Sequence, residues 1–294
     1  MDQAEKLRKI VQANNAAKMS ARVITVTSGK GGVGKSSISL NLAIALSHEG
    51  NRVVIIDGDF GLANVEVMLG IHPTYNLSDL IYGNKRVSEI ITKGPEGIGF
   101  ISGGSGIQEM NDLTKEQIMY MIQQFAELDK LADIILIDTS AGITNSVLEF
   151  VAASSEILLV TTPEPTSITD AYALLKTLNR KAGFDIKDIT IRMISNRVSS
   201  EEEGLDLYRK LNTVADRFLH LDMDYLGALM QETKVSKAVM YQKPAIVLYP
   251  NIHFSKKIKA FSKALCEKDV IKGNDQRGIA HLFTRLLLSK DKQD

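Results

Sequence analysis

Residues 22–36 decide the fold of this chain, and they read Arg22-Val23-Ile24-Thr25-Val26-Thr27-Ser28-Gly29-Lys30-Gly31-Gly32-Val33-Gly34-Lys35-Ser36. The β-branched run predicts a strand, and the apolar spacing after Ser36 predicts a helix that Gly50 ends. The segment between them fits the pattern G-x-x-x-x-G-K-[ST] in full. In this context, glycine backbone N–H groups and the helix N-terminus surround a polyphosphate. Lys35 would reach the β- and γ-phosphates, and Ser36 would offer its hydroxyl to Mg²⁺.

Apolar runs alternate with amphipathic helical patterns on the C-terminal side of this loop. The predicted strands are Val23–Thr27, Arg52–Ile56, Gly97–Ile101, Asp133–Ile137, Glu156–Thr161, Asp188–Ile194 and Tyr225–Leu229. The predicted helices are Ser36–His48, Lys115–Leu131, Ser167–Ala182, Glu201–Leu219 and Asn251–Lys268. Strands that are apolar throughout are typical of a parallel sheet covered on both faces. The sequence therefore predicts an α/β fold with a mostly parallel β-sheet, helices on both faces and right-handed crossovers.

Carboxylates follow two of these strands. Asp138 comes directly after the apolar run 134–137, and Asp57 and Asp59 follow the run 53–56. Because ligands bind at the carboxyl ends of strands in open α/β sheets, we expect these side chains beside the phosphate loop. Asp138 would hold Mg²⁺ directly or through water, and Asp59 would orient the water that attacks a γ-phosphate. Alternatively, Asp138 caps the next loop and the other two aspartates form only a turn.

Composition and charge exclude several classes of protein. Of the 294 residues, 44% are hydrophobic and 24% are charged, which excludes a disordered chain or a collagen-like fibre. Lysine plus arginine equals aspartate plus glutamate at 35 each, which argues against bulk electrostatic binding of nucleic acid. The single cysteine, Cys266, cannot form an internal disulfide or a cysteine-rich metal cluster within one chain. Without an apolar run of ~18 residues or a signal-peptide core, we expect a cytoplasmic protein.

Both ends of the chain carry short helical patterns outside the predicted domain, which covers residues 22–272. Residues 1–14 are predicted to form a helix, and residues 15–21 to link it to the domain. Residues 273–294 begin with a Gly-Asn-Asp break and contain an amphipathic helix. One arc of that helix holds five large apolar residues, Ile279, Leu282, Phe283, Leu286 and Leu287. From its own pattern, this arc either lies on a membrane surface or packs against the core of the domain.

The loop and the acidic segments together resemble the MinD/ParA family of ATPases. Lys30 directly follows the first glycine, as the lysine of the deviant Walker A motif of that family does. Segment 57–64 resembles their switch I, segment 138–143 their switch II, and segment 160–167 the stretch after their next strand. The resemblance covers residues 22–265 and implies a P-loop NTPase fold of the SIMIBI (MinD-like) type. It also implies a homodimer with ATP and Mg²⁺ between the copies, in which Lys30 enters the partner's nucleotide site.

The expected site residues follow from the motif and from this resemblance. Catalysis is assigned to Lys30, Lys35 and Asp59, and Mg²⁺ binding to Ser36 and Asp138. Nucleotide binding is assigned to Gly29, Lys30, Gly31, Gly32, Val33, Gly34, Lys35, Ser36, Ser37, Asp57, Glu164 and Asn196. Related GTPases carry an N/T-K-x-D motif for guanine where this chain has segment 195–199, which holds no aspartate. We therefore expect adenine, with Asn196 as a base contact; contacts from Met230 and Gln231 are left open.

The N-terminal segment Asp2-Gln3-Ala4-Glu5-Lys6-Leu7-Arg8 narrows the resemblance to the FlhG family, also called FleN or YlxH. That family regulates the number and placement of flagella. Its D-Q-A-x-x-L-R motif implies stimulation of the SRP-type GTPase FlhF, in which Gln3 would orient a water molecule. MinD-like proteins also end in a membrane-targeting helix, which favours the membrane reading of residues 273–294. The alternative for the N-terminus is a frayed helix without a partner.

The sequence thus predicts a slow regulatory ATPase that binds an anionic membrane as an ATP dimer and controls flagellar number and placement. Proteins of the flagellar basal body or switch would be further partners. The first alternative is a ParA-type partition ATPase, which would bind DNA through a basic patch. The zero net charge and the amphipathic tail count against it. The second alternative, a metal-cluster ATPase of the same superfamily, would need more cysteines than Cys266 alone. The third alternative is a nucleotide-dependent scaffold that hardly hydrolyses ATP, and a measurement of phosphate release would distinguish it from an enzyme.

Overall fold

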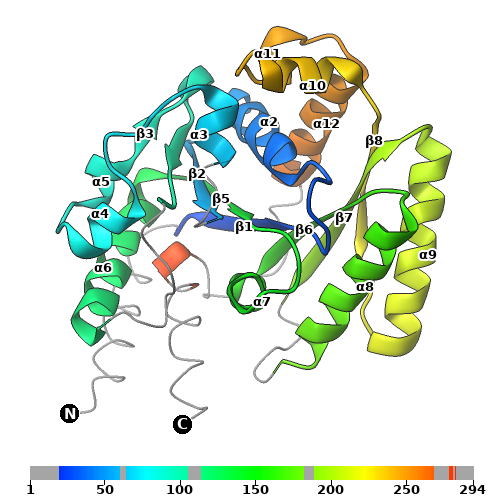
Figure 1. Ribbon diagram of the computed structural model, residues 1–294, viewed down its shortest axis with the longest axis horizontal. Helices are drawn as coiled ribbons and strands as arrows, with labels where there is room; N and C mark the ends of the chain where they lie inside the picture. The colour runs from blue at the N-terminus through cyan, green and yellow to red at the C-terminus, as the bar shows by residue number, and fades with distance from the viewer. Residues whose placement is uncertain are drawn as a thin grey trace.

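A computed structural model describes residues 20–59, 64–104, 114–181, 189–267, 278–280 and 282. Within these ranges lies one sheet of eight strands, in the order β3-β4-β2-β5-β1-β6-β7-β8 (Figure 1). The strands are β1 (Arg22–Thr27), β2 (Val53–Gly58), β3 (Thr92–Lys93), β4 (Gly99–Ile101), β5 (Ile134–Thr139), β6 (Glu156–Thr161), β7 (Thr190–Val198) and β8 (Asp224–Met230). Only the β3–β4 pair is antiparallel among the strand pairs of the described residues. The predicted α/β fold with a mostly parallel sheet is confirmed.

Helices cover both faces of this sheet (Figure 1). One face carries α2 (Lys35–His48) and α12 (His253–Glu267), with α3 (Asn64–Leu69), α10 (Thr233–Met240) and α11 (Ala245–Leu248) packed beside them. The other face carries α4 (Leu77–Tyr82), α5 (Val87–Ile90), α6 (Lys115–Leu131), α7 (Asn145–Ala153), α8 (Pro165–Asn179) and α9 (Glu201–Leu219). A 3₁₀ turn, η1 (Pro95–Gly97), precedes β4.

The alternation of side chains along the central strands explains why these strands are apolar throughout. In β5, Ile134 and Leu136 pack on the α2–α12 side, whereas Ile135 and Ile137 pack on the α6 side. The parallel register also aligns the strand ends, because Asp138 pairs with Asp57 of β2 and with Val26 of β1. The carboxyl ends of β1, β2 and β5 therefore meet where the glycine-rich loop leaves β1.

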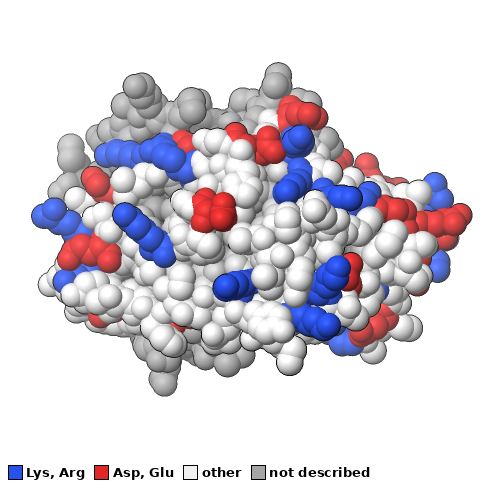
Figure 2. Space-filling view, turned by 90° about the horizontal axis from the view of Figure 1, so that it is seen from above, with Lys and Arg blue, Asp and Glu red and all other residues white. Residues whose placement is uncertain are grey.

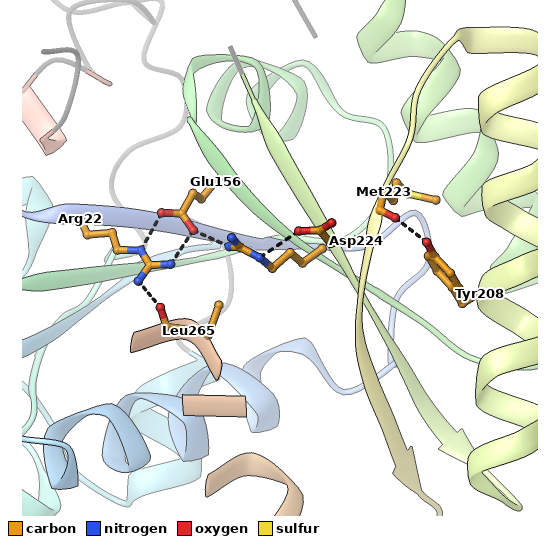
Figure 3. A network of polar contacts seen from close by, with 7 residues as sticks. Arg22, Glu156, Tyr208, Met223, Asp224 and Leu265 are labelled. Carbon is orange, nitrogen blue, oxygen red and sulfur yellow. Dashed lines mark hydrogen bonds and ion pairs between the residues drawn. The ribbon is translucent and has the colours of Figure 1, made fainter. Parts of the chain in front are cut away.

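A network of charged side chains lies at the opposite edge of the sheet, where strands begin (Figure 3). Arg22 forms a bidentate pair with Glu156, at 2.6 and 2.8 Å. Arg192 Nη1 lies 2.6 Å from the same carboxylate, and its Nε lies 3.6 Å from Asp224. Arg22 also donates to the backbone carbonyl of Leu265 at 2.7 Å, near the end of α12. The network thus joins β1, β6, β7 and β8 to the last turn of α12.

The start of the predicted C-terminal helix packs on the domain. Ile279 and Leu282 are fully buried in the cluster formed by α4, α5 and α6, and the N–H of Leu282 bonds to the carbonyl of Gly278. Ala21, which the sequence places in the linker, is buried in the same cluster. The other predicted membrane residues, Phe283, Leu286 and Leu287, lie outside the described residues, as do Gln3 and residues 1–14.

The surface of the described part of the chain carries charges of both signs. On the face in Figure 2, Lys and Arg side chains lie between Asp and Glu side chains around a broad uncharged area. Among the helices that the structure describes, none is long and apolar enough to span a membrane. The mixed charges match the net charge of zero and give no support on this face to the DNA-binding alternative.

Candidate nucleotide-binding site

The glycine-rich loop connects the end of β1 to the start of α2, as the sequence predicts. Gly32 and Gly34 have φ angles of 74° and 99°, in the left-handed region that favours glycine. A Cβ atom at Gly29 would lie 2.2 Å from the backbone of Asp170 in α8. Glycine is therefore required at position 29 for close packing, and at positions 32 and 34 to turn backbone N–H groups into the loop.

Lys35 occupies the centre of the site and is only 7% exposed. Its Nζ donates to Ser28 Oγ at 2.9 Å. Burial lowers the pKa of Lys35 below its usual value, and the charges of Asp138 and Asp59 oppose this shift. The lysine thus lies among two carboxylates in a water-poor pocket, where its charge can act strongly on a phosphate.

Asp138 is fully buried at the end of β5. Its Oδ1 accepts a hydrogen bond from Ser39 Oγ at 3.0 Å, whereas Oδ2 is buried without a hydrogen-bond partner among the described residues. Burial raises the pKa of Asp138 to about 6, and nearby Ser36 and Lys35 oppose the shift. An unpartnered carboxylate oxygen near a serine hydroxyl fits Mg²⁺, which prefers hard oxygen ligands. These donors fit the expected metal site at Ser36 and Asp138.

Asp57 and Asp59 have different positions although they are two residues apart. The Asp57 carboxylate is fully buried and accepts from the backbone N–H groups of Asp59 and Val65, both at 3.1 Å. Burial, followed by the charge of Asp138, raises the pKa of Asp57 to about 7. Asp59 is partly exposed and accepts from Asn64 at 3.1 Å. Asp57 therefore bonds to residues on both sides of segment 60–63, and Asp59 lies close enough to Lys35 to affect its pKa.

Lys30 lies at the exposed rim of the loop and contacts its own chain. Its Nζ is 2.5 Å from Glu164 and 2.7 Å from Thr166 Oγ1. The Lys30 and Glu164 side chains are 34% and 54% exposed. The hydrogen bond with Lys30 holds the pKa of Glu164 below its usual value. Because both groups are open to solvent, this pair is weak and easily exchanged.

Asn196 of β7 contacts the glycine-rich loop. Its Nδ2 donates to the carbonyl of Val33 at 2.7 Å, and the side chain is buried. A Cβ at Gly34 would lie 2.5 Å from the same nitrogen. The Asn196 amide nitrogen thus bonds to the loop itself, which favours a role for Asn196 in shaping the phosphate loop. This role is additional to the predicted contact with the base.

Comparison with known proteins places this geometry in a family. A family model described as ParA, "NUBPL iron-transfer P-loop NTPase", matches residues 19–266. The chain belongs to the MinD/ParA family of P-loop NTPases. Among the described residues, no group of three or more His, Cys, Asp or Glu is placed so that it could hold a metal ion.

Two MinD/ParA relatives are similar to this chain over most of its length. Antiactivator FleN of Pseudomonas aeruginosa is 42% identical over 82% of this chain and 85% of its own. The flagellum site-determining protein YlxH of Helicobacter pylori is 34% identical over 97% of this chain and 98% of its own. Among solved structures, the septum site-determining protein MinD of Pyrococcus horikoshii with Mg-ADP has a TM-score of 0.66 and 22% identity, covering 86% of this chain and 99% of that one. The last likeness shows the fold of the family.

The structure brings most of the predicted MinD/ParA site residues together and adds others. Lys35, Ser36, Asp57, Asp59 and Asp138 lie close enough to affect one another's pKa values or to bond. The buried Ser37 Oγ has no hydrogen-bond partner among the described residues. Sequence reasoning missed three residues that contact these side chains, namely Ser28, Ser39 and Thr166. Ser39 is one helical turn after Ser36, so helix periodicity could have found it.

Proposed function

We propose that this chain is an ATP-dependent switch of the FlhG type, which controls the number and placement of flagella. The gathering of Lys35, Asp59 and Asp138 in one pocket, with Lys30 at its exposed rim, carries the proposal. The relatives FleN and YlxH, whose names refer to antiactivation and to flagellum site determination, supply the cellular setting. ATP would be the substrate, in a cytoplasmic protein that associates peripherally with the membrane.

The chemistry assigns a distinct task to each pocket side chain. Lys35 would bind the β- and γ-phosphates, and the loop N–H groups would orient them. Ser36 and Asp138 would hold Mg²⁺, which when bound neutralises charge on the phosphates. Asp59 would accept a hydrogen bond from the attacking water and hold it in line. Its electrostatic contact with Lys35 supports this position.

Lys30 makes the site dependent on a second copy. In the single chain it pairs with Glu164 and Thr166, and these contacts are exposed. A nucleotide bound in the facing copy would offer Lys30 a denser negative charge than one carboxylate. Exchange of a weak pair for a phosphate contact would then favour the dimer in ATP. Hydrolysis would remove the contact and separate the copies.

The C-terminal helix would connect this dimer to the membrane. Ile279 and Leu282, the two residues of the apolar arc that the structure describes, are buried on the domain in the single chain. We propose that formation of the ATP dimer releases the arc, so that two arcs bind an anionic membrane together. One arc alone would bind weakly, because ordering the helix offsets most of the gain from burial.

Phe283→Glu should abolish membrane binding by the ATP dimer, because it places a charge in the centre of the apolar arc. The measurement is sedimentation with vesicles containing anionic lipid, in ATP and in ADP. Wild-type protein should sediment several-fold more in ATP. Thr284→Glu, on the polar side of the same helix, is the control and should retain most binding. Equal sedimentation of wild-type protein in ATP and ADP would contradict the switch.

Gln3→Ala should remove most of the stimulation of an FlhF-type GTPase, by roughly tenfold or more, while the ATPase of the chain stays unchanged. The reason is that a glutamine can orient the attacking water in the partner's site, whereas the segment lies outside the ATPase domain. Initial rates of GTP hydrolysis, measured with the full chain and with a peptide of residues 1–15, test this. Lys6→Ala, at a variable position of the motif, is the control. If Gln3→Ala stimulates the GTPase as strongly as the wild-type chain does, binding of the N-terminal segment, and not a catalytic group from Gln3, would explain the stimulation.

A further inference from the structure

Asp129 of α6 lies where the two ends of the domain meet. Its Oδ1 accepts from the backbone N–H of Ile279 at 2.8 Å, and its Oδ2 accepts from that of Ala280 at 3.4 Å. The backbone of Ala21 also acts to lower the pKa of this carboxylate, and Ala21 is buried in the same apolar cluster as Ile279. One side chain thus bonds to the first turn of the C-terminal segment and interacts electrostatically with the residue before β1.

The arrangement at the C-terminal segment is a helix cap supplied from another helix. The N–H of Leu282 bonds to the carbonyl of Gly278, so the turn begins at that residue. The free N–H groups at such a start require an acceptor, which a neighbouring Asp or Ser usually provides. Here Gly278 has a φ of 105°, and a Cβ on it would lie 2.5 Å from Asp129 Oδ2. Only glycine therefore admits the Asp129 carboxylate to this position.

Apolar packing joins the same three segments. Ile279 and Leu282 are buried in one cluster with Phe125 of α6, Ala21 and Val23. Displacing the C-terminal segment would thus open the surface against which the start of β1 packs. It would also remove the backbone donors Ile279 and Ala280 from a carboxylate that the surroundings keep away from water.

This carboxylate depends on its donors because it is buried. Burial raises the pKa of Asp129 to about 6, and the bonds from Ile279, Ala280 and Ala21 oppose the shift. A buried charge that loses hydrogen bonds either draws in water or moves toward solvent, since leaving it without donors is costly. In the first case its interaction with Ala21 is shared with water, and in the second case that interaction is lost.

We propose that Asp129 couples the two ends of the domain, so that release of the C-terminal segment at Gly278–Leu282 loosens the attachment of the N-terminal segment at Ala21. Coupling of this kind is reciprocal, and a ligand that holds the N-terminal segment away from the domain would equally favour release of the C-terminal one. These contacts lie within one chain, so the coupling does not depend on whether the C-terminal segment binds a membrane after its release.

Hydrogen–deuterium exchange of the full, nucleotide-free chain tests the coupling. Gly278→Ala forces Asp129 away from the C-terminal turn but has no contact with Ala21. We expect exchange to accelerate by roughly tenfold at 279–282 and also at 21–23, because a lost cap of this kind shifts a local equilibrium about that far. Asp129→Ala removes the carboxylate itself and should accelerate exchange in the same two segments. Glu127→Ala removes an exposed carboxylate from the same helix and should change neither segment.

Two results would overturn the proposal. Faster exchange confined to 279–282 in Gly278→Ala would show that the two ends open independently. Unchanged exchange in both segments would show that the carboxylate holds neither. If Asp129→Ala fails to fold, a chain truncated before Gly278 replaces it, with accelerated exchange at 21–23 as the expected result and unchanged exchange as the contrary one.

Discussion

Lys35→Gln should lower the affinity for ATP by roughly a hundredfold and leave the protein monomeric in ATP. The lysine is buried among Asp59 and Asp138, so its hydrogen bonds to the phosphates form in a water-poor pocket. Bonds to charged groups contribute about 1.5–3 kcal/mol each, and each 1.4 kcal/mol is a factor of ten in affinity. Glutamine keeps the length of the side chain approximately and loses the charge. Equilibrium titration with a fluorescent ATP analogue gives the affinity, and size-exclusion chromatography gives the oligomeric state.

Asp59→Ala is the matched contrast in the same pocket. It should bind ATP, lose hydrolysis by about two orders of magnitude and accumulate as a dimer in ATP. The reason is that Asp59 contacts Asn64 and the attacking water's expected position, whereas the loop and Lys35 hold the phosphates. Phosphate release and size-exclusion chromatography separate the two variants. Normal turnover by Asp59→Ala, or a dimer of Lys35→Gln in ATP, would refute the assigned roles.

Glu156→Gln should lower the free energy of unfolding by about 3–5 kcal/mol, because it removes the charged carboxylate that Arg22 and Arg192 share in a largely buried network. Arg22 and Arg192 both bond to Glu156 within 2.8 Å, in the network of Figure 3. Urea unfolding at pH 7 measures the loss. Glu127→Gln breaks an exposed pair with Lys130 on α6 and should leave the urea midpoint unchanged. A similar small effect of both variants would contradict the importance of the network.

The Glu156 carboxylate should also make the free energy of unfolding depend on pH. Burial alone would raise the pKa of Glu156, but Arg22 and Arg192 hold it below its usual value of 4.5. A carboxylate whose pKa is lower in the folded chain stabilises the fold above pH 4.5, and this contribution is lost as the pH falls through the folded-state pKa. The difference in unfolding free energy between wild-type protein and Glu156→Gln should therefore shrink below pH 4.5.

Long elements with side-chain caps were predictable from the sequence. The bounds of α6 and α9 agree with the predicted Lys115–Leu131 and Glu201–Leu219, because Thr114 and Ser200 accept hydrogen bonds from the first turns. The short elements β3, α4 and α11 show no period in the sequence and were not predicted. β7 continues past the predicted end at Ile194 to Val198, because its pairing with β8 resumes after a register shift.

Some site residues could be placed from local sequence patterns, whereas the positions of others depend on tertiary contacts. Asp57, Asp59 and Asp138 could be placed beside the loop, since the carboxyl ends of parallel strands share an edge. The contacts of Lys30 with Glu164, and of Asp129 with Ile279, join residues 134 and 150 positions apart. No local pattern specifies such pairs, which depend on how whole helices pack. Sequence therefore predicted which carboxylates follow neighbouring strand ends, but it did not predict the contacts of Lys30 with Glu164 or of Asp129 with Ile279.

The position of β1 in the middle of the sheet has a consequence for biosynthesis. Although β1 is the first strand of the domain, its neighbours are β5 and β6, and Thr139 of β5 bonds to the carbonyl of Val26 from 113 residues further along. At about 5–20 residues per second, a ribosome needs roughly 6–23 seconds to produce that partner strand. During this interval the apolar segment Val23–Val26 has no strand to pair with. The nascent chain therefore has to be kept from aggregating, and the core closes only after β5 and β6 have left the ribosome.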